Sequence, residues 1–242
     1  MTETSSLTTI SAVAFGFVLG LKHAIEADHL AAVSTIVSER KSLLSSMLVG
    51  GLWGVGHTIS LFIAGILVIV LHVEISERTA LALEFCVGLM LVALGVNALR
   101  KLARGGHLHL HVHQHGGRAH VHPHIHDREP ETDPHTHHGF RPGMRPLLVG
   151  MVHGLAGSAA LMLLVLSTLS SPLVGLAYIA VFGIGSIGGM MLMSALVSLP
   201  LYLTATRFTR ANLAMRGLAG LFSLSFGLFM IYEIGVAGSL FR

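Results

Sequence analysis

Six long apolar stretches dominate this 242-residue sequence and restrict its fold more than any other feature. A helix that crosses a bilayer needs about 20 mainly apolar residues. Only 11% of the residues are charged, whereas a soluble domain carries about 25%. We therefore predict an all-α integral membrane protein with six transmembrane helices. The expected spans are 8–37, 43–71, 79–102, 144–170, 173–204 and 209–237.

The segment 103–143 has a different composition from the rest of the chain. It contains 12 of the 17 histidines, together with prolines and acidic residues. Such a segment has too few apolar residues to form a core, so we predict a disordered loop. The chain then divides into 1–102, the loop 103–143, and 144–242. We expect the loop to bind divalent metals as a capture or buffer segment; a passive linker is the alternative.

The basic residues are unevenly distributed between the two ends of the predicted spans. Twelve of the 15 Lys and Arg residues follow spans one, three and five, while Arg78 and Arg242 lie on the opposite side. Because cytoplasmic loops carry the excess of Lys and Arg, both termini are expected outside and the histidine-rich loop in the cytoplasm. The predicted location is the cytoplasmic membrane. Aromatic residues do not interleave with the basic ones, so we expect no nucleic-acid partner.

The two halves of the chain resemble each other. Residues 20–23 match 150–153 at an offset of 130, and 53–57 match 182–186 at an offset of 129. Further matches at an offset of 132 pair two glycines of the third span with two of the sixth: Gly88 with Gly220 and Gly95 with Gly227. Because each half has three spans, the second copy must enter the membrane from the opposite side. This predicts two inverted three-helix repeats, as in many secondary transporters.

Ionisable side chains occur inside the predicted spans, where an Asp, Lys or Arg at a helix centre costs about 2.5–3.5 kcal/mol. Candidate metal ligands are His23, Asp28 and His29 in span one, His57 in span two and His153 in span four. At about 1.5 Å per residue, the histidines of all three spans can meet near the middle of the bilayer. The alternative is a buried polar cluster that only packs helices, and it weighs most for His153.

A straight first span would not bring its candidate ligands together. His23 and His29 are six residues apart, which is about 120° around a helix, so a compact site needs a broken or unwound helix. Lys22 and Glu26 are spaced for an i, i+4 pair, which we interpret as structural. Several glycines flank His57 and are expected to let span two approach span one: Gly50, Gly51, Gly54 and Gly56.

The ligand set is imidazole with carboxylate, and Cys86 is the single cysteine. This set suits Ni²⁺, Co²⁺ and Zn²⁺, whereas Cu⁺ prefers sulfur and Mg²⁺ prefers oxygen. We predict no prosthetic cofactor and treat the metal as a transported ion. Ligand type alone does not separate nickel, cobalt and zinc.

Two segments resemble motifs of a known family. His23-Ala24-Ile25-Glu26-Ala27-Asp28-His29 is similar to the HX4DH signature of the nickel/cobalt transporter superfamily, and Gly54-Val55-Gly56-His57-Thr58 resembles its second histidine motif. The resemblance implies metal recognition by His23, Asp28, His29 and His57. The longer permeases have eight spans, so this chain looks closer to the short branch. That branch includes urease-accessory-type permeases and six-span exporters with histidine-rich loops.

The leading hypothesis is secondary transport of Ni²⁺ or Co²⁺, with uptake favoured over export. No GxxxxGK[ST] segment occurs, so this chain itself is not expected to use ATP. Alternatives are transport of zinc or another divalent metal, and a membrane metal buffer or sensor without transport. We do not expect an enzyme, because an HExxH helix and clustered histidine boxes are absent from the sequence. A cytoplasmic metallochaperone is a candidate partner, and the oligomeric state is left open.

Overall fold

The computed structural model describes the membrane helices and a small hairpin. Side chains are described for residues 14–38, 40, 42–73, 75–104, 144–156, 171–205, 208–238 and 240–241. The strands 109–115 and 118–124 are described by their backbone. Apart from that hairpin, the described elements are helices. Four helices are long and apolar enough to cross a membrane, so the chain is a multi-pass membrane protein.

The four long helices match predicted spans closely. They are α3 (Leu43–Ile69), α4 (Glu77–Ala103), α7 (Pro172–Thr204) and α8 (Thr209–Tyr232), the last extended by the π-helix η1 (Glu233–Ala237). Serine side chains cap two of them, since Ser42 accepts a hydrogen bond from the Ser45 amide and Ser76 accepts one from the Thr79 amide. These caps satisfy main-chain donors at the helix start, where no carbonyl is available.

The other two predicted spans are described in part. Residues 14–23 are helical, a turn follows, and α2 (Ala27–Val37) resumes the helix. In the predicted fourth span, α5 (Met144–Gly154) is followed by a turn at Leu155, and 157–170 lie outside the described residues. The first stretch is therefore two helical pieces rather than one continuous span. Six membrane crossings remain a prediction.

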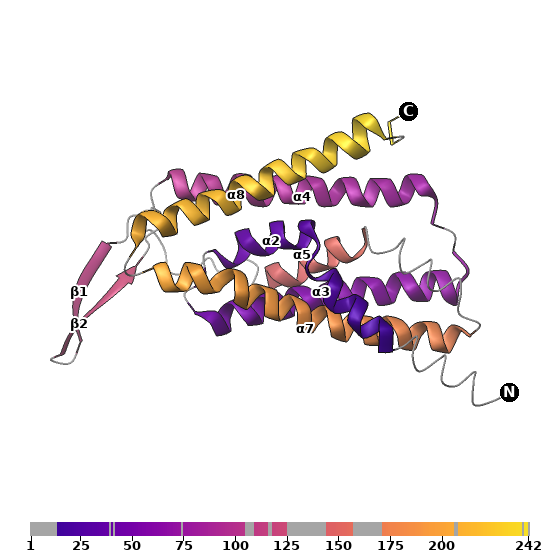
Figure 1. Cartoon of the computed structure of the whole chain (residues 1–242), viewed down its shortest axis with the longest axis horizontal. Helices are drawn as coiled ribbons and strands as arrows, with labels where there is room; N and C mark the ends of the chain where they lie inside the picture. The colour runs from indigo at the N-terminus through magenta and orange to yellow at the C-terminus, as the bar shows by residue number, and fades with distance from the viewer. Residues whose placement is uncertain are drawn as a thin grey trace, which may run out of the picture.

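Helices α4 and α8 lie side by side as one layer, and α3 and α7 form part of a second layer with α5 and α2 near the middle (Figure 1). The second layer is built around α3. One face of α3 carries exposed Leu52, Val55, Ile59 and Ile63 at spacings of three and four. Such an outward apolar stripe suits contact with lipid, and it leaves the opposite face of α3 to pack against α5 and α7.

The inward face of α3 is made of small residues that allow close approach. An added methyl group at Gly54 would meet the Cα of Ile187 on α7, and one at Gly56 would meet the Leu147 carbonyl on α5. Small residues permit this backbone contact between membrane helices. The prediction that these glycines bring span two against span one is wrong, because they contact α7 and α5 instead.

Close contacts in the two halves come in matching pairs. A methyl group at Gly20 would overlap the Phe182 carbonyl, and one at Gly150 would overlap the Trp53 carbonyl. In the sequence alignment of the halves, Gly20 corresponds to Gly150 and Trp53 to Phe182, so each contact is the other with the halves exchanged. The same exchange relates further glycine contacts: Gly56 with Leu147 and Gly185 with Phe17, and Gly88 with Gly227 and Gly95 with Gly220.

An antiparallel hairpin of β1 (His109–His115) and β2 (Arg118–His124) lies within the predicted loop 103–143. It projects beyond the end of α4, away from the end where α8 runs into η1 (Figure 1). A disordered loop is predicted for 103–143, whereas these two segments form paired strands. Histidine alternates there with other residues at a period of two, which suits a strand. Residues 105–108, 116–117 and 125–143 lie outside the described residues.

Candidate metal centre

The break in the first helix creates the site. After His23, the amides of Ile25 and Glu26 bond to carbonyls three residues back, at 3.0 and 3.1 Å. Glu26 is then extended, with φ −62° and ψ 150°, and α2 begins at Ala27. The prediction that a compact site requires a broken helix is confirmed. His23 ends one helical piece, while Asp28 and His29 lie in the first turn of the next.

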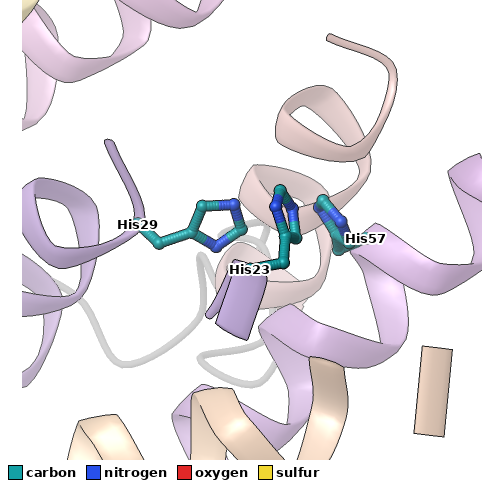
Figure 2. A group of neighbouring side chains, drawn as sticks. All are labelled: His23, His29 and His57. Atoms are coloured by element: carbon teal, nitrogen blue, oxygen red, sulfur yellow. The ribbon is translucent and has the colours of Figure 1, made fainter. Parts of the chain in front are cut away.

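Three histidines from two regions of sequence face one another in the interior (Figure 2). The ring centroids of His23 and His29 are 4.4 Å apart, those of His23 and His57 are 5.0 Å apart, and those of His29 and His57 are 5.3 Å apart. His29 and His57 are fully buried, and His23 is 5% exposed. One ring nitrogen from each lies within 4.8 Å of the others. Ligands at about 2.1 Å from one metal are roughly 3–4 Å apart, so small ring rotations would close this group on an ion.

A second group shares His29 with the first. The His153 Nε2 atom lies 2.9 Å from the Asp28 Oδ2 atom, and the rings of His29 and His153 are 4.2 Å apart. One ligand atom each from Asp28, His29 and His153 lies within 4.8 Å of the others. All five candidate residues of the sequence analysis thus meet in one place, and His29 is the member common to both groups.

The buried imidazoles have free hydrogen-bonding capacity. Among the described residues, both ring nitrogens of His29 and of His57 lack a hydrogen-bond partner, as do His23 Nε2 and His153 Nδ1. Buried polar atoms in proteins are normally hydrogen-bonded, because burial without a partner costs free energy. A divalent cation would use these lone pairs. The residues present therefore fit a borderline metal ion as substrate.

The Glu26 carboxylate has a different partner from the one predicted. Glu26 Oε2 lies 2.8 Å from His23 Nδ1, and the Lys22 side chain is exposed. The predicted Lys22–Glu26 pair is wrong, because the turn after His23 removes the i, i+4 geometry on which it depends. In a metal site, a carboxylate on the outer ring nitrogen fixes the tautomer and orientation of the liganding histidine. His23 has this arrangement.

Two aromatic residues border the cluster. The Trp53 ring lies 5.1 Å from His29 and 5.5 Å from His153, and Phe182 lies 5.6 Å from His23. Trp53 and Phe182 correspond in the two halves of the sequence, yet neither was predicted as a site residue. The sequence signal that could have identified them is their position within the two matched segments, 53–57 and 182–186. The serine that replaces His57 in the second half, Ser186, donates to the Gly20 carbonyl.

Carboxylates beyond the cluster were also missed by the sequence analysis. Asp28 lines a cleft of about 420 Å³ together with Glu84 of α4 and Glu233 of η1. Both glutamates are intramembrane acidic residues by sequence, which was a signal in itself. Because both glutamates are far from the histidines along the chain, the sequence did not indicate that they lie near the cluster.

Comparison with known proteins assigns a family. The chain is 39% identical over 236 residues to the urease accessory protein UreH of Bacillus sp. (strain TB-90). The match covers 96% of each chain. The chain belongs to the UreH family. No family model matches it, and no solved structure matches it.

The UreH match extends over both halves of the chain. Because it covers 96% of this sequence, it includes the histidine cluster as well as the membrane helices that surround it. The UreH-family assignment therefore rests on the overall sequence, and the metal-type geometry is an independent observation on this chain.

Proposed function

We propose that this protein is a secondary transporter of Ni²⁺, with Co²⁺ as a second substrate, in the cytoplasmic membrane. The observation that carries the proposal is the cluster of four buried histidines, His23, His29, His57 and His153, with the half-buried Asp28, inside a multi-pass membrane protein. Several of the ring nitrogens have no hydrogen-bond partner among the described residues. Imidazole with carboxylate suits these borderline ions. The UreH relative is named a urease accessory protein, which supports nickel, since urease is a nickel enzyme.

We propose further that the chain crosses the membrane six times as two inverted repeats. The matched glycine contacts support this, because exchange of the two halves converts the Gly20–Phe182 contact into the Gly150–Trp53 contact. In transporters built from such repeats, the site lies where the repeats meet and one repeat rocks against the other. The cluster combines His23, His29 and His57 of the first half with His153 of the second, so relative motion would open and close it.

The orientation that we propose places the histidine-rich hairpin in the cytoplasm. The preceding helix α4 ends with Arg100 and Lys101, and such residues favour the cytoplasmic side. In this orientation the site lies between an outer face and the histidine-rich hairpin. We propose uptake over export because the HX4DH-type motif of residues 23–29 is intact. The hairpin would hold imported metal and offer it to a cytoplasmic metallochaperone.

The register of the hairpin supports metal capture. Three pairs of histidines are directly opposite across the two strands: His109 with His124, His111 with His122, and His113 with His120. Opposite residues of an antiparallel pair lie on the same face, about 4.5–5.5 Å apart at Cβ. Each pair therefore places two imidazole-bearing positions where one metal can bridge them.

A stoichiometry measurement tests the paired arrangement. Substitution of both members of one pair, His111→Asn with His122→Asn, should remove one bound Ni²⁺ ion. Substitution of members of two different pairs, His111→Asn with His120→Asn, removes the same number of histidines and should remove two ions. Equal losses in the two double variants would contradict pairwise binding.

Transport is tested by accumulation of radioactive nickel in expressing cells. Cells with the wild-type protein should gain nickel, and Zn²⁺ should compete less well than Co²⁺. His29→Asn should abolish the gain, whereas His72→Asn, at an exposed residue outside the cluster, should leave it unchanged. A fall in cellular nickel would indicate export, and preferential competition by Zn²⁺ would indicate a zinc transporter. Binding by purified protein with no flux into liposomes would indicate a buffer or sensor.

A further inference from the structure

The cleft beside Asp28 has an electrostatic character that the metal cluster does not explain. It lies between α2, α4, α8 and η1, and its acidic lining residues are Asp28, Glu84 and Glu233. No Lys or Arg lines it among the described residues. Within the described ranges, neither Glu84 nor Glu233 forms an ion pair. The rest of the lining is mainly apolar, including Phe226, Phe229 and Met230.

The three carboxylates are close enough to act on one another. The carboxylates of Asp28, Glu84 and Glu233 line the same cleft, so their negative charges repel one another there. Like charges without cations are unfavourable in a membrane interior, where charged groups mark ion pathways. Glu233 also opens the π-helix η1, a local distortion that is frequent at functional sites. A divalent cation in the cleft would relieve the repulsion.

The inner wall of the cleft is continuous with the histidine cluster. Asp28 belongs to both, since its Oδ2 atom lies 2.9 Å from His153 Nε2 and one of its oxygens lies within 4.8 Å of a His29 nitrogen. His29 is fully buried, and neither of its ring nitrogens has a hydrogen-bond partner in the ranges that the structure describes. An ion held by Asp28 would therefore meet an unsatisfied buried imidazole as its next ligand.

We propose that Glu84 and Glu233 form the access route by which the metal reaches the histidine cluster, with Asp28 as the transfer ligand between them. This inference rests on the proposed function and adds residues to it. Carboxylates hold borderline ions less tightly than imidazoles do, so affinity rises along the route from glutamate to histidine. An acidic cleft with low-dielectric walls also raises the local cation concentration and the association rate.

The position of the cleft fits access from outside. Glu84 lies seven residues into α4, roughly 10 Å along the helix, and Glu233 follows α8 at the same end of the molecule. The hairpin is at the opposite end (Figure 1). In the proposed orientation, the route therefore opens toward the outer face and the hairpin lies on the cytoplasmic side of the cluster.

The test is the rate at which Ni²⁺ reaches the cluster in the full-length protein. Trp53 is the single tryptophan and lies 5.1 Å from the His29 ring, so bound Ni²⁺ should quench its fluorescence. Stopped-flow mixing with NiCl₂ then gives an association rate, and titration gives the equilibrium affinity. The variants are Glu84→Gln, Glu233→Gln and the double variant. The matched control is Glu77→Gln, on the first turn of α4 and outside the cleft.

We expect the double variant to associate with Ni²⁺ about tenfold more slowly, with equilibrium quenching changed less than threefold. Glu77→Gln should match the wild type. Added salt should slow association in the wild type and have little effect on the double variant, because screening acts on the removed charges. Unchanged association in the double variant would overturn the route, as would loss of equilibrium quenching, which would make the glutamates structural or direct ligands.

Nickel flux into liposomes, measured on the same variants, separates this inference from the proposed function. If the wild type and the double variant transport nickel equally well, the route is overturned and the proposed function remains. A wild type that does not transport, combined with slow quenching in the double variant, would overturn the function and support the route as access to a binding site.

Discussion

Loss of His29 should affect metal binding more than loss of any other histidine of the cluster. His29 belongs to both groups of candidate ligands, one with His23 and His57 and one with Asp28 and His153. Removal of His57 leaves the second group complete, whereas removal of His29 leaves two ligands in each group. The substitution His29→Asn keeps a polar side chain of similar size, so helix packing should change little.

The expected loss of nickel affinity can be bounded from the known effects of removing residues around a metal site. Loss of a residue that only supports a ligand costs 10- to 100-fold in metal affinity. Loss of a ligand common to both groups should therefore cost at least 100-fold, about 2.8 kcal/mol. His57→Asn should cost less than His29→Asn. This order is a consequence of the geometry and not of residue type, because both are buried histidines.

Quenching of Trp53 provides the assay. The histidine-rich loop is proposed to bind metal as well, so the full-length titrations should be repeated in a background that lacks residues 106–139. Open-shell Ni²⁺ should quench the indole, while d¹⁰ Zn²⁺ should bind with far less quenching. The control is His72→Asn, at an exposed position outside both groups. A His29→Asn protein that binds Ni²⁺ within threefold of the background protein would falsify the shared-ligand interpretation.

Three further outcomes are expected. Gly150→Ala would place a methyl group 2.8 Å from the Trp53 carbonyl carbon, whereas ordinary contacts begin at 3.4 Å. Helix α5 should therefore shift by more than the roughly 0.2 Å that metal geometry tolerates, and nickel affinity should fall at least tenfold. The control Gly188→Ala, whose methyl group meets nothing within 4 Å, should leave nickel affinity unchanged. Deletion of 106–139 should lower the number of bound nickel ions and weaken uptake without abolishing it, as measured by equilibrium dialysis and cellular accumulation. Trp53→Phe should remove the fluorescence signal but retain nickel flux, because the second half carries phenylalanine at the corresponding position; lost flux would make the indole part of the site.

The local pattern of the first half was sufficient to predict most of the candidate site. Imidazoles and carboxylates are rarely buried in membrane helices unless they bind something, so His23, Asp28, His29 and His57 could be selected without a structure. The same reasoning predicted the helix break, since His23 and His29 cannot meet on a straight helix. The pairing of Glu26 was mispredicted because i, i+4 rules assume the continuous helix that the site excludes.

The sequence by itself determined the membrane class, the bounds of the four long helices and the residue types of the site, because hydropathy and ligand chemistry are local properties. Tertiary structure decided which helices meet. The sequence predicted that the glycines of α3 would pack against the first span, but they contact α5 and α7. The contact with α5 places His153 beside Asp28. It also decided the acidic cleft, since Glu84 and Glu233 are far apart in sequence and come together with Asp28 only through the packing of α2, α4 and α8. Long-range packing depends on shape complementarity between whole helices, which no local spacing records.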